Sequence, residues 1–486
     1  MATAKRPSSD AKKKIVSAVA ENDVDVTPPK RFFVEMLTRD IELEDAILDL
    51  LDNCVDGAVR ANSSKRRKPA SKDAYEGYWA EIELDEKRFS IKDNCGGIPF
   101  DVARDYAFKF GRPRSDIDND LQTVGVYGIG MKRALFKLGQ DSKVFSRSST
   151  GSFLVHIDKA WIQNDKWQIH LGEVKAGALN HDGVKIEVTD LHPGISSRFD
   201  GSASAFEGDL IGKIRNHYAY IIQKGFKVKV NGKVVAPNLI QTLMDLKPKK
   251  GAPAIAPYLY ETEDDGVTVR LAMGMYAAFP TETELGDFVE GRRSKNSAGW
   301  TVICNDRVVL SHDTTHRTGW GESGVPAYHS QFVMLSGVVE FTGNDAAKLP
   351  VTTTKRGINL DSPLYASVKD VMRDALKHFT TFTNHWKTDT AERVALQKQA
   401  VPMDIRTAAI QIPAAQWQEV RKNLKGRRFV PELPKPNSIR THGRMSFIRP
   451  LDAIESVREF LEMPHDGPAA DVGAAAFDWV AEQAKA

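Results

Sequence analysis

Residues 44–58 constrain the fold more than any other stretch of this sequence. At helical period these residues and the preceding Leu43 give an apolar stripe, formed by Leu43, Ile47, Leu50, Cys54 and Ala58. On another side of the same helix, Asp49, Asn53 and Asp56 recur at spacings of four and three, so their side chains point the same way. Stacked like charges repel by roughly 0.2–0.5 kcal/mol per pair. This face is therefore either a solvated acidic surface or a site for a hard cation, with a carboxylate that orients water.

Two glycine-bearing segments follow this helix. Residues 91–98 (Ile-Lys-Asp-Asn-Cys-Gly-Gly-Ile) place Asp93 at a strand end, before two glycines that let a backbone approach a flat ligand. A plain Asx turn is the alternative interpretation of Asp93. Residues 125–132 (Gly-Val-Tyr-Gly-Ile-Gly-Met-Lys) form a glycine turn that opens a helix, where free N–H groups can meet phosphate. The Gly-x-x-Gly-x-Gly spacing is not that of the dinucleotide fingerprint, and the segment is not a Walker loop because no Gly-Lys-Ser/Thr follows.

The order of these three motifs resembles the GHKL ATPases, which include gyrase B, MutL, MORC proteins, heat-shock chaperones and sensor kinases. The resemblance implies a Bergerat-type α/β sandwich that binds ATP and Mg²⁺, with Asn53 as the metal ligand. The residues that it implies for nucleotide binding are Asn53, Asp56, Asp93, Gly97, Ile98, Gly125, Tyr127, Gly128, Ile129, Gly130, Met131 and Lys132. Asp93 would accept the adenine amino group, and Lys132 would lie near the β- or γ-phosphate.

The catalytic carboxylate departs from the family's pattern. Most relatives have Glu one turn before the Asn, and this chain has Asp49, which is a methylene shorter. A carboxylate is kept, but its reach changes by about 1 Å, which matters for positioning. Three outcomes stay open: the backbone compensates, Asp52 or Glu44 substitutes, or the chain binds ATP and turns it over very slowly.

Two further positions differ from the usual pattern near the nucleotide. Cys95 stands where Gly is usual, and Val184 stands where relatives have a Thr hydroxyl near the base. We interpret Cys54 and Cys95 as small packing residues rather than redox centres.

The sequence divides into four parts. We expect a flexible basic tail at 1–24, the GHKL ATP-binding domain at 25–198, a transducer-like α/β domain at 199–360 and a helical region at 361–486. In the first domain, alternation predicts strands at 79–84, 88–92, 143–147, 152–157, 167–171 and 183–191. Periodicity predicts helices at 99–110, 130–138, 204–224, 404–424 (broken near Pro413), 451–461 and 470–484, and another from 363 onward. Asn231-Gly232 indicates a hairpin between 226–230 and 233–235.

Two loops are candidates for closing the site. The polar stretch 111–123 lies where GHKL proteins carry the loop over ATP, so Arg112 and Arg114 either contact phosphates or are solvated.

Residues 300–310 are similar to the strand-turn-strand of the MutL and MORC transducer. Residues 349–358 resemble the loop that sends a lysine to the γ-phosphate, and Lys355 is the candidate; an exposed loop lysine is the alternative.

Composition excludes several classes of protein. Hydrophobic residues make up 41% and charged residues 27%, which is ordinary for a globular protein, and a net charge of +3 does not indicate a general polyanion binder. Three cysteines are too few for a disulfide framework, so a cytoplasmic location is expected. No apolar run reaches membrane-spanning length, so no membrane partner is expected.

The resemblance to the GHKL ATPases implies an ATP-hydrolysing clamp or remodeller, nearest in architecture to MORC and MutL relatives. The apolar patch at 32–37 either packs on its own domain or helps form a homodimer when ATP binds. DNA or a protein is the expected client, by analogy with the family. The alternative is a nucleotide-dependent scaffold or chaperone-like protein with negligible turnover.

Overall fold

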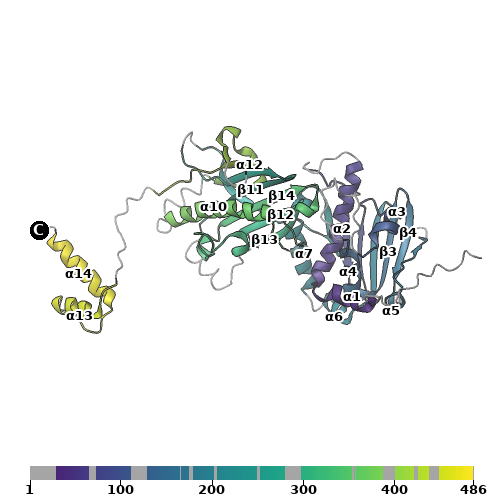
Figure 1. Ribbon diagram of the computed structural model, residues 1–486, viewed down its shortest axis with the longest axis horizontal. Coiled ribbons are helices and arrows are strands. Elements are labelled where there is room, and N and C mark those ends of the chain that lie inside the picture. The colour runs from purple at the N-terminus through teal and green to yellow at the C-terminus, as the bar shows by residue number, and fades with distance from the viewer. Residues whose placement is uncertain are drawn as a thin grey trace, which may run out of the picture. The chain divides into compact units, whose positions relative to one another are not determined.

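A computed structural model of the chain describes residues 29–64, 73–110, 128–164, 166–174, 179–201, 205–248, 252–279, 297–352, 355, 357–386, 400–420, 425–436 and 448–484. The chain forms two compact units, residues 1–435 and 436–486. The larger unit contains two principal sheets, coloured from purple to green in Figure 1.

The first sheet has eight strands in the order β5-β4-β3-β6-β2-β1-β7-β8. Its strands are β1 (Trp79–Leu84), β2 (Phe89–Asp93), β3 (Gly139–Ser148), β4 (Gly151–Ile157), β5 (Leu171–Gly172), β6 (Gly183–Leu191), β7 (Lys227–Val230) and β8 (Lys233–Val234). Neighbours are antiparallel except β1 and β7, which run parallel. The predicted hairpin of β1 and β2 is confirmed, and it delivers Asp93 at the end of β2.

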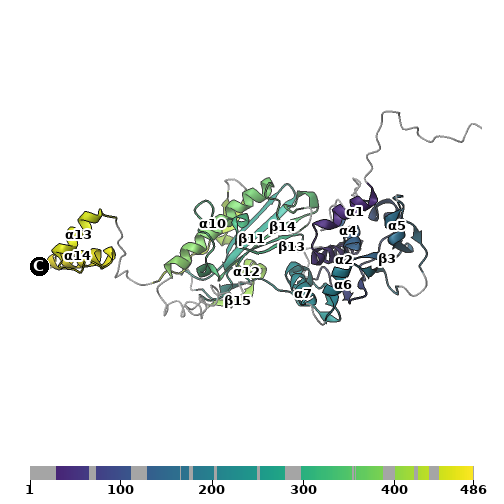
Figure 2. The same cartoon turned by 90° about the horizontal axis from the view of Figure 1, so that it is seen from below.

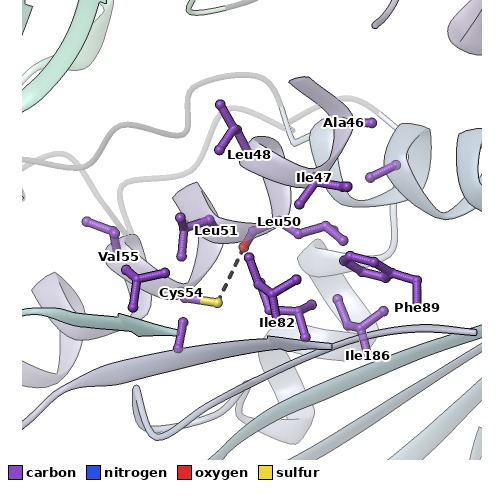
Figure 3. Packing of buried hydrophobic residues seen from close by; sticks show 14 of the residues in the cluster. Ala46, Ile47, Leu48, Leu50, Leu51, Cys54, Val55, Ile82, Phe89 and Ile186 are labelled. Carbon is purple, nitrogen blue, oxygen red and sulfur yellow. Dashed lines mark hydrogen bonds between the residues drawn. The ribbon is translucent and has the colours of Figure 1, made fainter. Parts of the chain in front are cut away.

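Helices cover one face of this sheet. They are α1 (Lys30–Arg39), α2 (Leu43–Ser64), α3 (Phe100–Val102) with a following π-helical turn (Ala103–Ala107), α4 (Gly130–Leu138), α5 (Lys159–Gln163), α6 (Pro193–Phe199), α7 (Phe206–His217) and α8 (Ala219–Gln223). Figure 3 shows the apolar side of α2 above Ile82, Phe89 and Ile186 of the sheet. The whole predicted stripe of α2 is buried. The expected α/β sandwich is therefore confirmed.

Two local features of this layer go beyond the sequence prediction. The hairpin at Asn231-Gly232 forms as predicted, with φ of 45° and 78°, but β7 pairs with β1 and so extends the first sheet beyond the expected boundary at 198. Gly139 directly follows α4 as the first residue of an extended strand. A Cβ there would lie 2.8 Å from the carbonyl oxygen of Asp190, so close strand packing requires this glycine.

The second sheet has seven strands in the order β13-β12-β14-β11-β10-β17-β16. They are β10 (Tyr258–Asp264), β11 (Val267–Met275), β12 (Gly299–Cys304), β13 (Arg307–Asp313), β14 (Leu335–Gly343), β16 (Gln418–Val420) and β17 (Gly426–Phe429). Helix α10 (Pro363–His385) packs on one face, alongside β11 and β14 in Figure 2. Helices α8 and α12 (Ile405–Gln411) cover the other face. Because both faces are covered, every residue of β12 is buried.

The predicted strand-turn-strand at 300–310 is present as β12 and β13, joined by Asn305 and Asp306. Both turn residues have left-handed φ, 47° and 64°, which matches the twist that a two-residue hairpin needs. Short 3₁₀ turns, η3 (His316–Thr318), η4 (Ser330–Phe332), η5 (Ala346–Lys348) and η6 (Ala414–Gln416), join other elements.

The region after residue 361 is only partly helical. Helices α10, α13 (Leu451–Phe460) and α14 (Ala469–Gln483) confirm three predicted helices. The helix expected over 404–424 ends at Gln411, and β16 and β17 lie along β10 instead. A further pair, β9 (Gln241–Asp245) and β15 (Ala400–Asp404), forms a small separate sheet. In the smaller unit, α13 and α14 contact each other through Phe460 and Trp479, with ring centroids 5.6 Å apart.

Within the described residues, no helix combines the length and the apolar character that crossing a bilayer would require.

Candidate functional site

The acidic face of α2 is not a solvated surface. Asp49 and Asp56 are each 3% exposed, whereas Asn53 between them is exposed. Asp49 accepts a hydrogen bond from Arg133 of α4, with 2.5 Å between Oδ2 and Nη2. The face therefore presents one accessible amide beside a carboxylate whose orientation is fixed by a neighbouring cation.

Helix α4 begins directly against Asp49. A Cβ built on Gly130, the first residue of α4, would lie 3.2 Å from Oδ2 of Asp49 and 3.3 Å from its Cβ. No side chain caps this helix, so its first N–H groups have no intrahelical acceptor. Gly128 has a left-handed φ of 65°, which favours glycine. The absence of side chains at Gly128 and Gly130 thus brings a helix N-terminus beside the α2 face.

Lys132 is directed into its own domain. It is 1% exposed, and its Nζ donates to the carbonyl oxygens of Ala107 at 2.8 Å and Lys109 at 2.7 Å, and also to that of Gly128. Burial lowers the pKa of the Lys132 ammonium to about 8. This placement differs from the expected one beside a β- or γ-phosphate. The amine instead hydrogen-bonds residues on both sides of the range 111–127, namely Ala107 and Lys109 before it and Gly128 after it.

Asp93 is a buried acceptor, 5% exposed. Its Oδ1 accepts the backbone N–H of Cys95 at 2.8 Å and of Val184 at 3.3 Å, so the Asx turn considered above is present. Val184 contributes its backbone where relatives offer a hydroxyl. Burial raises the pKa of the Asp93 carboxyl. Because both backbone bonds end at Oδ1, Oδ2 is the oxygen that could accept a further donor.

Glycines let three backbones meet around Asp93. A Cβ on Gly97, whose φ is 71°, would lie 1.9 Å from the carbonyl oxygen of Arg147. A Cβ on Gly183 would lie 2.0 Å from the carbonyl oxygen of Asp93 itself. The N–H of Ile98 donates to Oγ of Ser146 at 2.8 Å, which fixes this segment on β3. The surroundings of Asp93 are therefore built from closely packed backbone that a larger residue would displace.

Cys54 and Cys95 lie in the same region and are both buried. Burial, and then the charge of Asp93, raises the pKa of each thiol. The thiol of Cys54 donates to the carbonyl oxygen of Leu50 at 3.4 Å, the dashed line in Figure 3. A Cβ on Gly57 would lie 3.0 Å from the Cβ of Cys95, so these residues pack closely. The geometry agrees with two packing thiols.

The two substitute carboxylates considered for Asp49 are both engaged elsewhere. Asp52 is fully buried and accepts from Tyr218, Arg307 and Lys355. Glu44 bonds Arg198 at 2.8 Å and precedes Asn53 by nine residues, about 13 Å along a helix. Asp49 is thus the carboxylate of the three that lies beside the candidate site.

Lys355 reaches Asp52 of α2 across 303 residues of sequence. Its residue is 9% exposed, and Nζ donates to Oδ2 of Asp52 at 3.1 Å. The structure therefore brings Lys355 to the residue preceding Asn53, where sequence reasoning expected it near the nucleotide. Sequence reasoning considered Asp52 only as a substitute for Asp49, and it missed the pairing of Asp52 with Lys355 and with Arg307. The similarity of residues 300–310 to a transducer hairpin was the available signal for Arg307.

Several predicted positions lie outside the described residues. These are Gly125, Tyr127, Arg112 and Arg114. Within the described ranges, no group of three or more His, Cys, Asp or Glu side chains could hold a metal ion. A cation at Asn53 would therefore need other ligands, such as phosphate oxygens and water.

The comparisons with known proteins point to the same segment. Residues 41–182 match the family model described as histidine kinase-, DNA gyrase B- and HSP90-like ATPase. This range contains Asp49, Asn53, Asp93 and Gly130. A search of curated proteins found no match.

Proposed function

We propose that this chain is a Mg²⁺-dependent ATPase that works as an ATP-gated, dimerising clamp or remodeller, with a GHKL-type ATP-binding domain at residues 41–182 as its motor. The observation that carries the proposal is the meeting of two elements. The polar face of α2, with Asp49 and Asn53, lies against the uncapped start of α4 at Gly130.

Each part of this arrangement suits a nucleotide. The N–H groups at the start of α4 would bind phosphate oxygens, which a helix N-terminus favours. The exposed amide oxygen of Asn53 would hold Mg²⁺. The carboxylate of Asp56 lies on the same side of α2. The chemistry that a Mg²⁺ ion would supply when bound is to offset the negative charge of the phosphates. Asp49 would accept a proton from the attacking water, with Arg133 fixing its orientation.

Adenine recognition is assigned to Asp93. Its buried Oδ2 would accept the exocyclic amino group, while Oδ1 stays bound to the backbone of Cys95 and Val184. A buried acceptor rejects a base that cannot donate to it, because the acceptor would then remain unpaired.

Helix α1 packs one aromatic side chain on its own domain and leaves two apolar side chains exposed for a dimer contact. Phe33 packs edge-to-face on Phe110 and Trp167 of its own domain, at 5.3 and 5.5 Å between ring centroids. Phe32 and Met36 on the same helix are 54% and 59% exposed. These two side chains would contact a second copy of the chain when ATP binds. DNA or a protein in the cytoplasm is the proposed client.

The test is steady-state phosphate release from ATP and Mg²⁺, with and without duplex DNA. We expect the wild type to turn over and Asn53→Ala and Asp49→Ala to lose activity. Asp101→Ala, which removes an exposed carboxylate of the same domain, should behave as the wild type. Turnover that survives Asp49→Ala would assign the chemistry to another acid. A wild type that binds no ATP would refute the proposal.

One observation favours the alternative of a nucleotide-dependent scaffold. The short Asp49 side chain is already bonded to Arg133, which would hold it away from a water. The scaffold predicts ATP binding with negligible turnover in the wild type. It also predicts that Arg133→Met raises turnover by freeing the carboxylate.

A further inference from the structure

Asp52 is a buried carboxylate of α2 that accepts hydrogen bonds from three side chains. It is 0% exposed and immediately precedes Asn53. Its Oδ1 accepts from the hydroxyl of Tyr218 at 2.6 Å and from Nε of Arg307 at 2.8 Å, and its Oδ2 accepts from Nζ of Lys355 at 3.1 Å. Two cations from the second sheet's side of the unit therefore meet one carboxylate next to the candidate metal ligand.

The two cations are held very differently. The side chain of Arg307 is 0% exposed, donates from Nη1 to the carbonyl oxygens of Val308 and His217, and lies 4.2 Å from the ring centroid of Tyr218. Arg307 also begins β13, so its backbone belongs to a sheet. These contacts make Arg307 a fixed partner of Asp52.

Lys355 has fewer restraints. Its side chain is 11% exposed, and within the described residues its one hydrogen bond from Nζ goes to Asp52. It lies in the loop closed by the bridge between Val351 and Ile358, with a left-handed φ of 57°. A lysine ammonium is a point charge on a flexible stem, whereas an arginine fork is fixed by its geometry. Lys355 is thus the exchangeable partner of Asp52.

The contact between the turn before Arg307 and the first sheet's layer does not depend on Lys355. Asp306, in the turn before Arg307, accepts from Nζ of Lys224 at 2.6 Å and from the hydroxyl of Tyr75 at 3.2 Å. Arg406 adds a bond to Asp306 at 3.4 Å and pairs with Glu340. The turn stays anchored to the first sheet's layer when Lys355 changes partner.

We propose that Asp52 is a positioning residue that competes with the terminal phosphate of ATP for Lys355. Asp52 holds the ammonium at the α2 residue that precedes Asn53, and a nucleotide that carries a third phosphate draws it away, while Arg307 remains. This inference rests on the proposed function. It states that the strength of the Asp52–Lys355 pair sets the preference of the site for ATP over ADP.

The test is the ratio of the ADP and ATP dissociation constants, measured by titration calorimetry with Mg²⁺. Lys355→Met should lower the preference for ATP. Asp52→Asn should raise it about tenfold, because a charge-assisted bond to the competitor is lost. The double variant Asp52→Asn/Lys355→Met should match Lys355→Met alone, because Asp52 acts through Lys355.

A second variant keeps the test decisive if Asp52→Asn does not fold. Asp52→Asn leaves Arg307 buried without its counter-charge, which is strongly destabilising. Tyr218→Phe keeps every charge and removes one donor to Asp52, so Asp52 should hold Lys355 more tightly and the ATP preference should fall about threefold. Glu44→Gln, which neutralises a buried acid of α2 paired with Arg198, is the matched control and should leave the ratio unchanged.

The outcomes separate the two proposals. A wild type that binds neither nucleotide refutes the proposed function and this inference with it. A wild type that binds both, with a ratio that Tyr218→Phe and any folded Asp52→Asn leave unchanged, overturns the inference alone. Equal weakening of ATP and ADP would show that Asp52 is merely structural, which also overturns it.

Discussion

The substitution Gly130→Ala tests whether Asp49 is the catalytic carboxylate. The added methyl group would lie 3.2 Å from Oδ2 of Asp49 and 3.3 Å from its Cβ and Cγ, just below ordinary van der Waals contact. Asp49 must therefore move by a few tenths of an ångström. The chain can adopt the helical backbone at this position with alanine, because φ of Gly130 is not left-handed.

The expected loss of activity follows from this displacement. A misplacement of about 1 Å costs roughly 100-fold in rate, so a shift of about 0.3 Å should reduce turnover about fourfold. Alanine is favoured over glycine in a helix by about 0.5–1 kcal/mol, which offsets some of the crowding. Stability should therefore stay close to that of the wild type, and the defect should appear in the chemical step.

The assay compares turnover at saturating ATP with the dissociation constant of ATP. Gly212→Ala in α7 is the matched control, since a Cβ there meets nothing within 4 Å. We expect Gly130→Ala to lower turnover with ATP affinity unchanged, and Gly212→Ala to change neither. Equal turnover in the two variants would refute the placement of Asp49 as the group that positions water.

Three other substitutions test the surroundings of the site. The pKa of Lys132 is about 8 against an ordinary 10.5, so between these pH values the unfolded chain holds a proton that the native chain releases. The free energy of unfolding should therefore rise with pH across this range, by up to about 3 kcal/mol. Urea unfolding of Lys132→Met at the same pH values should lack this rise. Gly97→Ala, whose Cβ would lie 1.9 Å from a carbonyl oxygen, should lose more than about 3 kcal/mol in calorimetric unfolding. Gly151→Ala, at a left-handed position with open space, is its control and should lose less. Asp93→Ala should reduce the preference for ATP over GTP about tenfold in competition binding; an unchanged preference would remove Asp93 from base recognition.

Local periodic signals made much of the first layer predictable. The stripe of α2 is buried as expected because a 3.6-residue period alone decides which residues face the sheet. The hairpin ending at Asp93 and the turn at Asn231-Gly232 were also predictable, since each depends on a few adjacent residues. Strands β16 and β17 were not, because three or four residues carry too little periodicity to outweigh a helical pattern.

The orientation of charged side chains was the harder part of the site to predict. Sequence order placed Lys132 beside a glycine turn, but its amine turns inward because three carbonyl oxygens accept it there. Arg307 and Lys355 meet Asp52 across 255 and 303 residues of sequence. Such pairs follow from how two sheets pack, which no local pattern contains.

The two roles assigned to α2 follow from helical geometry. Adjacent residues of a helix point about 100° apart, so Asn53 can face a nucleotide while Asp52 faces the fixed cation Arg307. Because both residues belong to one hydrogen-bonded helix, the Cα atom of Asn53 cannot move without moving the Cα atom of Asp52. In the proposed site, a ligand bound at Asn53 would therefore act on the same helix that carries Asp52, and Asp52 is bonded to Arg307 at the start of β13. We therefore expect α2 to link the proposed site to the second sheet.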